Sequence, residues 1–154
     1  MDRLLAIDLG VKTGLALFNR IGELEWYRSQ NYGNRNRLSR AAYSILNNIS
    51  GLSLIVIEGG GSLYKIWRKE AIRAGIGCKQ IHAHEWRGDI LFCREQRNCT
   101  LAKHNAIRFA KIVIDKCGQN KSTSLTDDAA EAILTGYWFM KKTGWCTNKL
   151  GPLR

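Results

Sequence analysis

Two apolar runs at the start of the chain predict paired β-strands. Residues 4–7 are continuously apolar and end at one carboxylate, Asp8, and a second run over residues 13–18 follows a turn bracketed by Gly10 and Gly14. Apolar runs of this length, separated by turn residues, are typical of strands. A further turn at residues 21–22 leads into residues 23–29, so we expect an antiparallel meander of three strands.

The remaining chain alternates helical periodicity with one more continuous apolar run. Apolar residues recur at helical spacing over residues 38–49, and the run at residues 54–57 then ends at a second carboxylate, Glu58. A continuous apolar run between two helices is typical of a buried parallel strand. We also expect helices over residues 63–74, from Leu101 and from Thr126, a short strand at residues 79–83, a polar loop at 118–124 and an irregular tail at 144–154. The pattern predicts one α/β domain over residues 1–154, with a mixed sheet flanked by helices.

Three glycines follow Glu58, at the end of the expected parallel strand. They remove side chains where another group can approach the strand end, although a flexible turn would look the same. Ser62 is then expected to cap the next helix. That helix carries four cations, Lys65, Arg68, Lys69 and Arg73, interleaved with Tyr64 and Trp67. Basic and aromatic residues together suit a phosphate backbone and an unstacked base, while Trp67 would equally suit the core.

The composition favours a polyanionic partner. Lys and Arg total 24 against 13 Asp and Glu, which gives a formal net charge of +11. Such a charge favours nucleic acid, because each neutralised phosphate releases counterions. The sequence has no apolar run of membrane-spanning length, no signal-peptide pattern and no segment typical of a membrane anchor. We therefore expect a cytoplasmic or nucleoid-associated protein without a membrane partner.

Other features of the sequence leave alternatives open. Arg35, Arg37 and Arg40 on the first helix form either a solvated face or a phosphate contact. Arg87, Arg94 and Arg97 make a basic loop after the short strand. His82 and His84 lack a third ligand nearby and predict no metal site. The five cysteines form no CxxC pair, so we expect reduced, partly buried thiols rather than disulfides or a zinc ribbon.

Carboxylates stand where regular elements end or begin: Asp8, Glu58, and Asp128 with Glu131 at the start of the last helix. Two of these sites have a structural alternative, since Asp8 can cap a turn and Asp128 with Glu131 can form a capping box. However, residues three apart project from one side of a helix, and divalent cations such as Mg²⁺ prefer oxygen ligands. An acidic cluster in a basic domain is the arrangement expected of a metal-dependent nuclease.

These residues resemble the RuvC-type Holliday junction resolvases of the ribonuclease H-like superfamily, over nearly the entire chain. The resemblance rests on Ile7-Asp8-Leu9-Gly10 with Thr13-Gly14, on Ile55-Val56-Ile57-Glu58, and on Asp127-Asp128-Ala129-Ala130-Glu131-Ala132. It implies a ribonuclease H-like mixed sheet, and catalytic metal ligands at Asp8, Glu58, Asp128 and Glu131. The family usually has Asp where Glu131 stands, so Asp127 is an alternative ligand. The resemblance also implies two Mg²⁺ ions per site, for which Mn²⁺ would substitute.

The resemblance further implies an endonuclease that resolves four-way junctions by paired symmetric nicks. Two active sites are then needed, hence a C2 homodimer, whose face would come from the helix at 63–74 or from the last helix. We expect the DNA contacts at Lys12, Lys65, Arg68, Lys69, Arg73 and Arg87. The short chain is more similar to phage or organellar branches of the family than to long bacterial forms.

Three alternatives remain open from the sequence. A nuclease of the same fold could act on RNA or an RNA/DNA hybrid. A nucleotide-binding domain of the actin and sugar-kinase type would need a second lobe, for which this chain has no room. A non-catalytic branched-DNA-binding module would use its acids only as caps.

Overall fold

Five strands form one mixed sheet in the order β3-β2-β1-β4-β5 in the computed structural model, which describes residues 1–118 and 124–154. The strands are β1 (Arg3–Asp8), β2 (Lys12–Asn19), β3 (Leu24–Asn31), β4 (Leu52–Glu58) and β5 (Gly77–Ile81). The first three pair antiparallel, and β1-β4 and β4-β5 pair parallel. The expected meander and the buried parallel strand are both confirmed.

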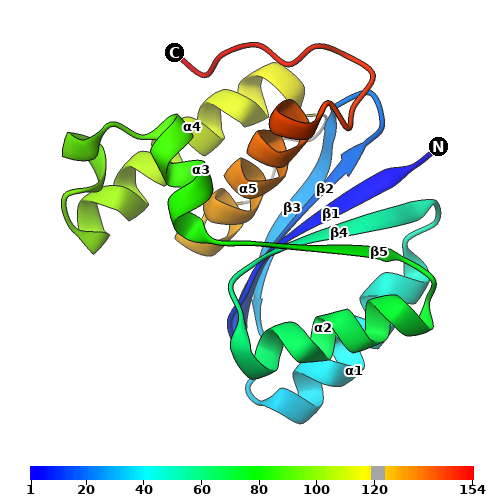
Figure 1. Cartoon of the computed structure of the whole chain (residues 1–154). Coiled ribbons are helices and arrows are strands. Elements are labelled where there is room, and N and C mark those ends of the chain that lie inside the picture. The colour runs from blue at the N-terminus through cyan, green and yellow to red at the C-terminus, as the bar shows by residue number, and fades with distance from the viewer. Residues whose placement is uncertain (119–123) are drawn as a thin grey trace.

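Helices cover both faces of this sheet (Figure 1). The helices are α1 (Arg35–Asn48), α2 (Gly61–Arg73), α3 (Ala83–Ile90), α4 (Cys99–Cys117) and α5 (Asp127–Thr143), with a 3₁₀ turn, η1 (Cys93–Gln96), between α3 and α4. Figure 1 shows α1 and α2 on one face, and α3, α4 and α5 on the other. The tail after α5 is irregular, as expected.

Alternation along the central strands produces two separate cores. On β1, Leu4 and Ala6 pack toward α4 and α5, whereas Leu5 and Ile7 pack toward α1 and α2. All four side chains are fully buried. A large aliphatic side chain buried this completely stabilises the fold by about 1.5–3 kcal/mol. The central position of β1 and β4 therefore explains why their sequences are continuously apolar up to the carboxylate that ends each strand.

Helix α5 lies close against the sheet because glycines stand where the two meet. A Cβ built on Gly14 of β2 would lie 2.0 Å from the Asp128 carbonyl oxygen, and one on Gly136 of α5 would lie 2.4 Å from Phe18 Cε2. Because of this close packing, most residues of α5 are buried, including Ile133 and Met140. It is thus the element that brings the last group of acids onto the sheet.

Several local expectations were wrong. Helix α2 begins two residues early, with Gly60 as N-cap, so Ser62 lies inside the helix and is not the cap. The positive φ of Gly61, 76°, makes the turn that starts the helix. The short strand ends at Ile81 rather than at residue 83, and helix α3 follows, so Arg87 is helical rather than part of a basic loop.

All five cysteines are free, but Cys93 and Cys99 are exposed rather than partly buried. Of the expected polar loop, residues 119–123 lie outside the described residues. A search of the described helices finds none that is long and apolar enough to cross a bilayer.

Candidate metal centre

The centre is formed where β1 and β4 end side by side. Asp8 and Glu58 occupy the same register position on these parallel neighbours. Helix α5 crosses the same sheet edge and adds Glu131 from its second turn. One carboxylate oxygen from each of these three residues lies within 4.8 Å of the other two. The structure therefore brings together acids that are 50 and 73 residues apart in the sequence.

Glu58 is held in place by hydrogen bonds from two other elements. Its Oε2 atom accepts from Trp86 Nε1 of α3 at 2.8 Å and from Thr135 Oγ1 of α5 at 3.0 Å. Burial and the charge of Glu131 raise the pKa of Glu58, while the two hydrogen bonds lower it. The bonds orient the carboxylate and favour its ionised form, which is the form that binds a cation.

Asp8 is the most strongly perturbed acid of the centre. Burial, followed by the negative charges of Glu58, Glu131 and Asp128, raises its pKa from 3.8 to about 9. A carboxylate surrounded by carboxylates is stable as an anion only when a cation neutralises the group. This donor set of clustered oxygens fits a hard divalent ion such as Mg²⁺, which Asp8, Glu58 and Glu131 would hold.

Arg87 belongs to this centre, a role that the sequence analysis did not predict. Its Nη2 atom donates to Glu131 Oε1 at 2.5 Å, and its guanidinium lies 5.3 Å from the Trp86 ring centroid. Residues 83–90 form a helix, so Trp86 reaches Glu58 while its neighbour Arg87 reaches Glu131. The sequence feature that could have indicated this role is the position of Arg87 directly after an aromatic residue, Trp86, that is buried.

The other two acids of α5 are paired with cations from different elements. Lys12 Nζ of β2 lies 3.3 Å from Asp128 Oδ2, and Lys103 Nζ of α4 lies 3.1 Å from Asp127 Oδ2. Asp128 also accepts a hydrogen bond from Ser29. Burial would raise the pKa of Asp127, but the hydrogen bond from Lys103 and its charge leave that pKa below its usual value.

Asp128 and Asp127 thus flank the triad instead of joining it. The N-cap of α5 is Thr126, whose hydroxyl accepts from the Ala129 amide, so the capping-box interpretation of Asp128 with Glu131 is wrong. Asp128 is still near enough for its charge to raise the pKa of Asp8. Both residues remain predictions as metal ligands.

The predicted DNA-binding cations fall into two places. Lys12 and Arg87 pair with acids at the centre, whereas Lys65, Arg68, Lys69 and Arg73 are exposed on α2, on the other face of the sheet. Trp67 is fully buried in the core beneath them and so does not provide a stacking surface. Arg73 also pairs with the buried Glu70, at 3.3 Å.

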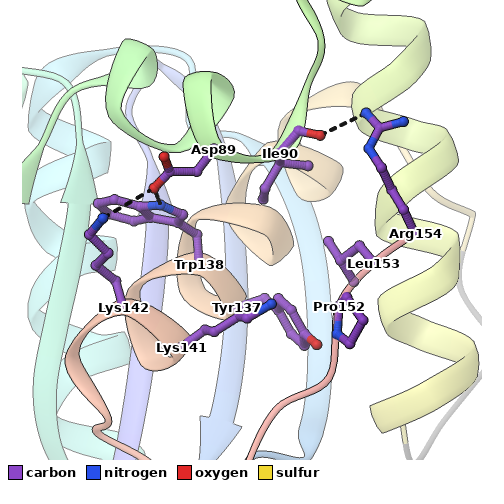
Figure 2. A pocket seen from close by; sticks show the side chains of 9 residues that line it. All are labelled: Asp89, Ile90, Tyr137, Trp138, Lys141, Lys142, Pro152, Leu153 and Arg154. Atoms are coloured by element: carbon purple, nitrogen blue, oxygen red, sulfur yellow. Dashed lines mark hydrogen bonds and ion pairs between the residues drawn. The ribbon is translucent and has the colours of Figure 1, made fainter.

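A cavity of about 430 Å³ lies away from the acids, at the C-terminal half of α5 (Figure 2). Trp138 Nε1 donates to Asp89 Oδ2 at 2.6 Å on one wall, and the tail residues Pro152 and Leu153 form another. Figure 2 shows the Lys142 ammonium beside the same Asp89 carboxylate. None of the four predicted catalytic acids lines this cavity, so its shape does not define the metal centre.

Comparison with known proteins bears on the fold. No family model and no curated protein matches the sequence. The structure is similar to that of T. thermophilus RuvC in complex with a Holliday junction substrate, with a TM-score of 0.66 and 11% sequence identity. The match covers 97% of this chain and 99% of the RuvC chain. Together with its mixed sheet of three antiparallel and two further parallel strands flanked by helices, this shows that the chain has the ribonuclease H-like fold.

Proposed function

We propose that this protein is a metal-dependent endonuclease that cuts four-way DNA junctions by paired symmetric nicks. The observation that carries the proposal is the convergence of Asp8, Glu58 and Glu131, whose carboxylate oxygens lie within 4.8 Å of one another. The chain has a net charge of +11 and also a cluster of acids, so two different parts of the molecule would serve the two tasks of a nuclease, binding DNA and binding metal. The surface attracts phosphates, and the cluster holds the cations that the reaction requires.

Residues of the chain would hold the metal ions and orient one of the carboxylates. Asp8, Glu58 and Glu131 would hold the divalent ions, two Mg²⁺ per site, with Mn²⁺ as a substitute. Trp86 and Thr135 fix the Glu58 carboxylate through their hydrogen bonds. When bound, such ions activate a water molecule for attack on a phosphodiester and stabilise the leaving oxygen.

Lys12 and Lys103 are well placed to contact the phosphate backbone beside the cluster. Each side chain is 55% exposed, although each already pairs with an acid at the start of α5. Because an exposed ion pair contributes little stability, a phosphate oxygen can replace the carboxylate as partner at small cost. The exposed cations of α2 extend the positive surface on the other side of the sheet.

The choice of a four-way junction over other nucleic acids draws support from the T. thermophilus RuvC structure, which holds such a junction. A nuclease acting on RNA or an RNA/DNA hybrid would use the same acids. A non-catalytic binding module would not require three acids to converge, since each could cap a different element. A cytoplasmic or nucleoid location and a branched DNA partner follow from the proposal.

The test is cleavage of a labelled synthetic four-way junction in Mg²⁺, beside linear duplex, an RNA/DNA hybrid and a reaction with chelator. We expect symmetric nicks in the junction only, and none with chelator or in Asp8→Asn. That variant should bind the junction as tightly as the wild type or more tightly, because it replaces a group that repels phosphates when ionised and leaves the positive surface unchanged.

Each other result has a definite meaning. Cleavage of the hybrid alone would move the substrate to RNA and keep the metal centre. If the wild type binds the junction tightly but does not cleave it in Mg²⁺ or in Mn²⁺, the nuclease is rejected. Cleavage by Asp8→Asn at the wild-type rate would reject Asp8 as a ligand.

A further inference from the structure

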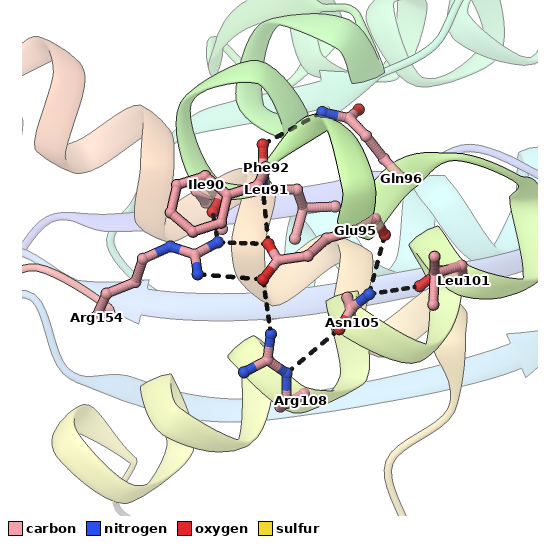
Figure 3. A network of polar contacts seen from close by, with 9 residues as sticks. All are labelled: Ile90, Leu91, Phe92, Glu95, Gln96, Leu101, Asn105, Arg108 and Arg154. Carbon is pink, nitrogen blue, oxygen red and sulfur yellow. Dashed lines mark hydrogen bonds and ion pairs between the residues drawn. The ribbon is translucent and has the colours of Figure 1, made fainter.

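The 3₁₀ turn between α3 and α4 is fixed by a buried carboxylate, Glu95 (Figure 3). Glu95 is 8% exposed, and its oxygens accept from Arg108 Nη2 at 3.0 Å, from Arg154 Nη1 at 3.1 Å and from the Phe92 amide at 2.9 Å. A second Arg154 nitrogen also donates to it. Hydrogen bonds of this kind to a charged group are about twice as strong as neutral ones.

Further contacts tie the same turn to α4 and to the tail. Asn105 Nδ2 donates to the Glu95 carbonyl oxygen at 2.9 Å, and Arg154 Nη2 donates to the Ile90 carbonyl oxygen at 2.9 Å. The Arg154 guanidinium also lies 3.7 Å from the Phe92 ring centroid. The hydrogen bond from Arg154 and the surrounding positive charges lower the pKa of Glu95 to about 2. The turn is therefore held by contacts from both α4 and the tail although it lies at the surface.

This turn and the residue that follows it present two cations to solvent. Arg94 and Arg97 stand immediately before and two residues after Glu95, and both are exposed. Within residues 1–118 and 124–154, neither guanidinium pairs with a carboxylate, and Arg94 lies over the Phe92 ring, 5.2 Å from its centroid. From residue 90 to residue 111, Glu95 is the sole acid against five Lys and Arg. Because that acid is buried and neutralised, the outer surface of the segment is positive.

The chain on each side of the turn carries a cation that pairs with an acid in the first two turns of α5. Arg87, six residues before the turn begins at Cys93, donates to Glu131, and Lys103, six residues after Arg97, pairs with Asp127. Six residues of chain span at most about 20 Å, so the turn begins within that distance of Arg87. Helix α2, by contrast, lies on the opposite face of the sheet.

We propose that the η1 segment (residues 92–98) is a second nucleic-acid contact, in which Glu95 holds Arg94 and Arg97 against the phosphate backbone of the DNA bound at the metal centre. This rests on the proposed function for the identity of the partner. The contact is independent of α2 and flanks the acids from the α4 side. Glu95 acts as a positioning residue, since it fixes the turn that carries the two arginines and does not touch the DNA.

The test measures binding without cleavage, by fluorescence anisotropy of a labelled four-way junction in chelator over a range of salt. Arg94→Ala/Arg97→Ala should bind roughly tenfold more weakly at low salt, and the slope of log affinity against log salt should fall by about 2, one for each lost phosphate contact. The matched control is Lys141→Ala/Lys149→Ala. It removes the same charge from two exposed positions, one in the tail and one at the far end of α5, about 20 Å from Asp127 by helix rise.

The variant Glu95→Gln tests whether Glu95 acts by holding the turn in place or only through its charge. It makes the protein more positive, so long-range attraction alone would tighten binding, whereas loss of the fixed turn should weaken it several-fold. The proposal is overturned if the arginine double variant binds like the wild type, or if the lysine control loses as much affinity. Junction cleavage by the wild type with unchanged binding by the arginine variant rejects this surface alone. Tight binding without cleavage by the wild type rejects the nuclease and leaves this surface intact.

Discussion

Asp8 links the chemistry of the centre to the stability of the fold. Its pKa is about 9 in the folded protein against 3.8 ordinarily, so the folded state keeps a proton that the unfolded chain releases. The free energy of unfolding therefore falls as pH rises from about 4 toward 9. We expect Asp8→Asn to remove this loss and, in chelator at pH 8, to raise the melting temperature by roughly 5 °C or more.

The control for this prediction is Asp2→Asn, which changes the same charge at an exposed position. It should melt like the wild type across the pH range. Mg²⁺ should raise the melting temperature of the wild type at pH 8 and have a much smaller effect on Asp8→Asn. A variant that is no more stable than the wild type at pH 8 would contradict the raised pKa.

Arg87 is predicted to stabilise the acids when no metal is bound. Arg87→Gln leaves Glu131 without its 2.5 Å partner and removes the positive charge that lowers the pKa of Glu58. Because the Arg87 side chain is 28% exposed, we expect a loss of about 1–3 kcal/mol in the free energy of unfolding in chelator. The melting temperature measured with and without Mg²⁺ checks this.

The same experiment has a charge-preserving control. Arg87→Lys should lose less stability than Arg87→Gln, and Mg²⁺ should raise the melting temperature of Arg87→Gln by more than it raises that of the wild type. Equal stability of all three proteins in chelator would show that Arg87 does not neutralise the cluster.

For the residues of the metal centre, the sequence predicted the acids better than the cations that pair with them. Asp8 and Glu58 were recognisable because each ends an apolar run, where a charge is unusual. Arg87 was placed in a basic loop because its helix has a single fully buried residue, Trp86, and therefore no apolar periodicity. The pairing of Lys12 with Asp128 depends on tertiary contacts that local patterns do not encode.

Among the elements, α5 determines the position of Asp128 and Glu131, and Gly14 allows α5 to lie close against the sheet. Gly14→Ala would place a Cβ 2.0 Å from the Asp128 carbonyl oxygen, so the first turns of α5 must shift. We expect a loss of about 1–3 kcal/mol in stability and a roughly hundredfold loss of cleavage, because Asp128 and Glu131 move with the helix. Chemical unfolding and cleavage rates measure the two effects.

Gly88→Ala is the matched control for this substitution. Gly88 lies inside α3, and a Cβ there would meet nothing within 4 Å. It should therefore be neutral or stabilise the protein by up to about 1 kcal/mol, with cleavage unchanged. If Gly14→Ala behaved in the same way, the close packing of α5 on β2 would not be what positions its acids.

Elements with strong periodicity were predicted from the sequence, and those without it were not. The strands were recognisable because β1, β2 and β4 alternate between two cores and are apolar on both faces. Helix α3 and the η1 turn were missed, since their structure depends on capping by Glu85 and on the Glu95 network. Ser62 was chosen as a cap by residue type, but the backbone freedom of the preceding glycines decided where α2 begins.

For the whole molecule, paired nicks require two metal centres and therefore a dimer. Of the two faces expected from the sequence, α5 has most of its surface buried in the core with the sheet and α4. Helix α2 still exposes an apolar residue, Ile72, which is 61% exposed. We therefore predict a homodimer through α2, with a mass in solution of twice 17.4 kDa by light scattering.

Ile72→Glu places a charge in this expected interface and should give a monomer. Because a monomer carries one metal centre, it should leave singly nicked junctions where the dimer leaves two resolved duplexes. Asn148→Glu adds the same charge at an exposed position of the tail and should remain a dimer that resolves junctions. An Ile72→Glu dimer would place the interface on another face, and a wild-type monomer that resolves junctions would contradict the requirement for a dimer. The ratio of nicked to resolved product therefore reports how the two centres are coupled.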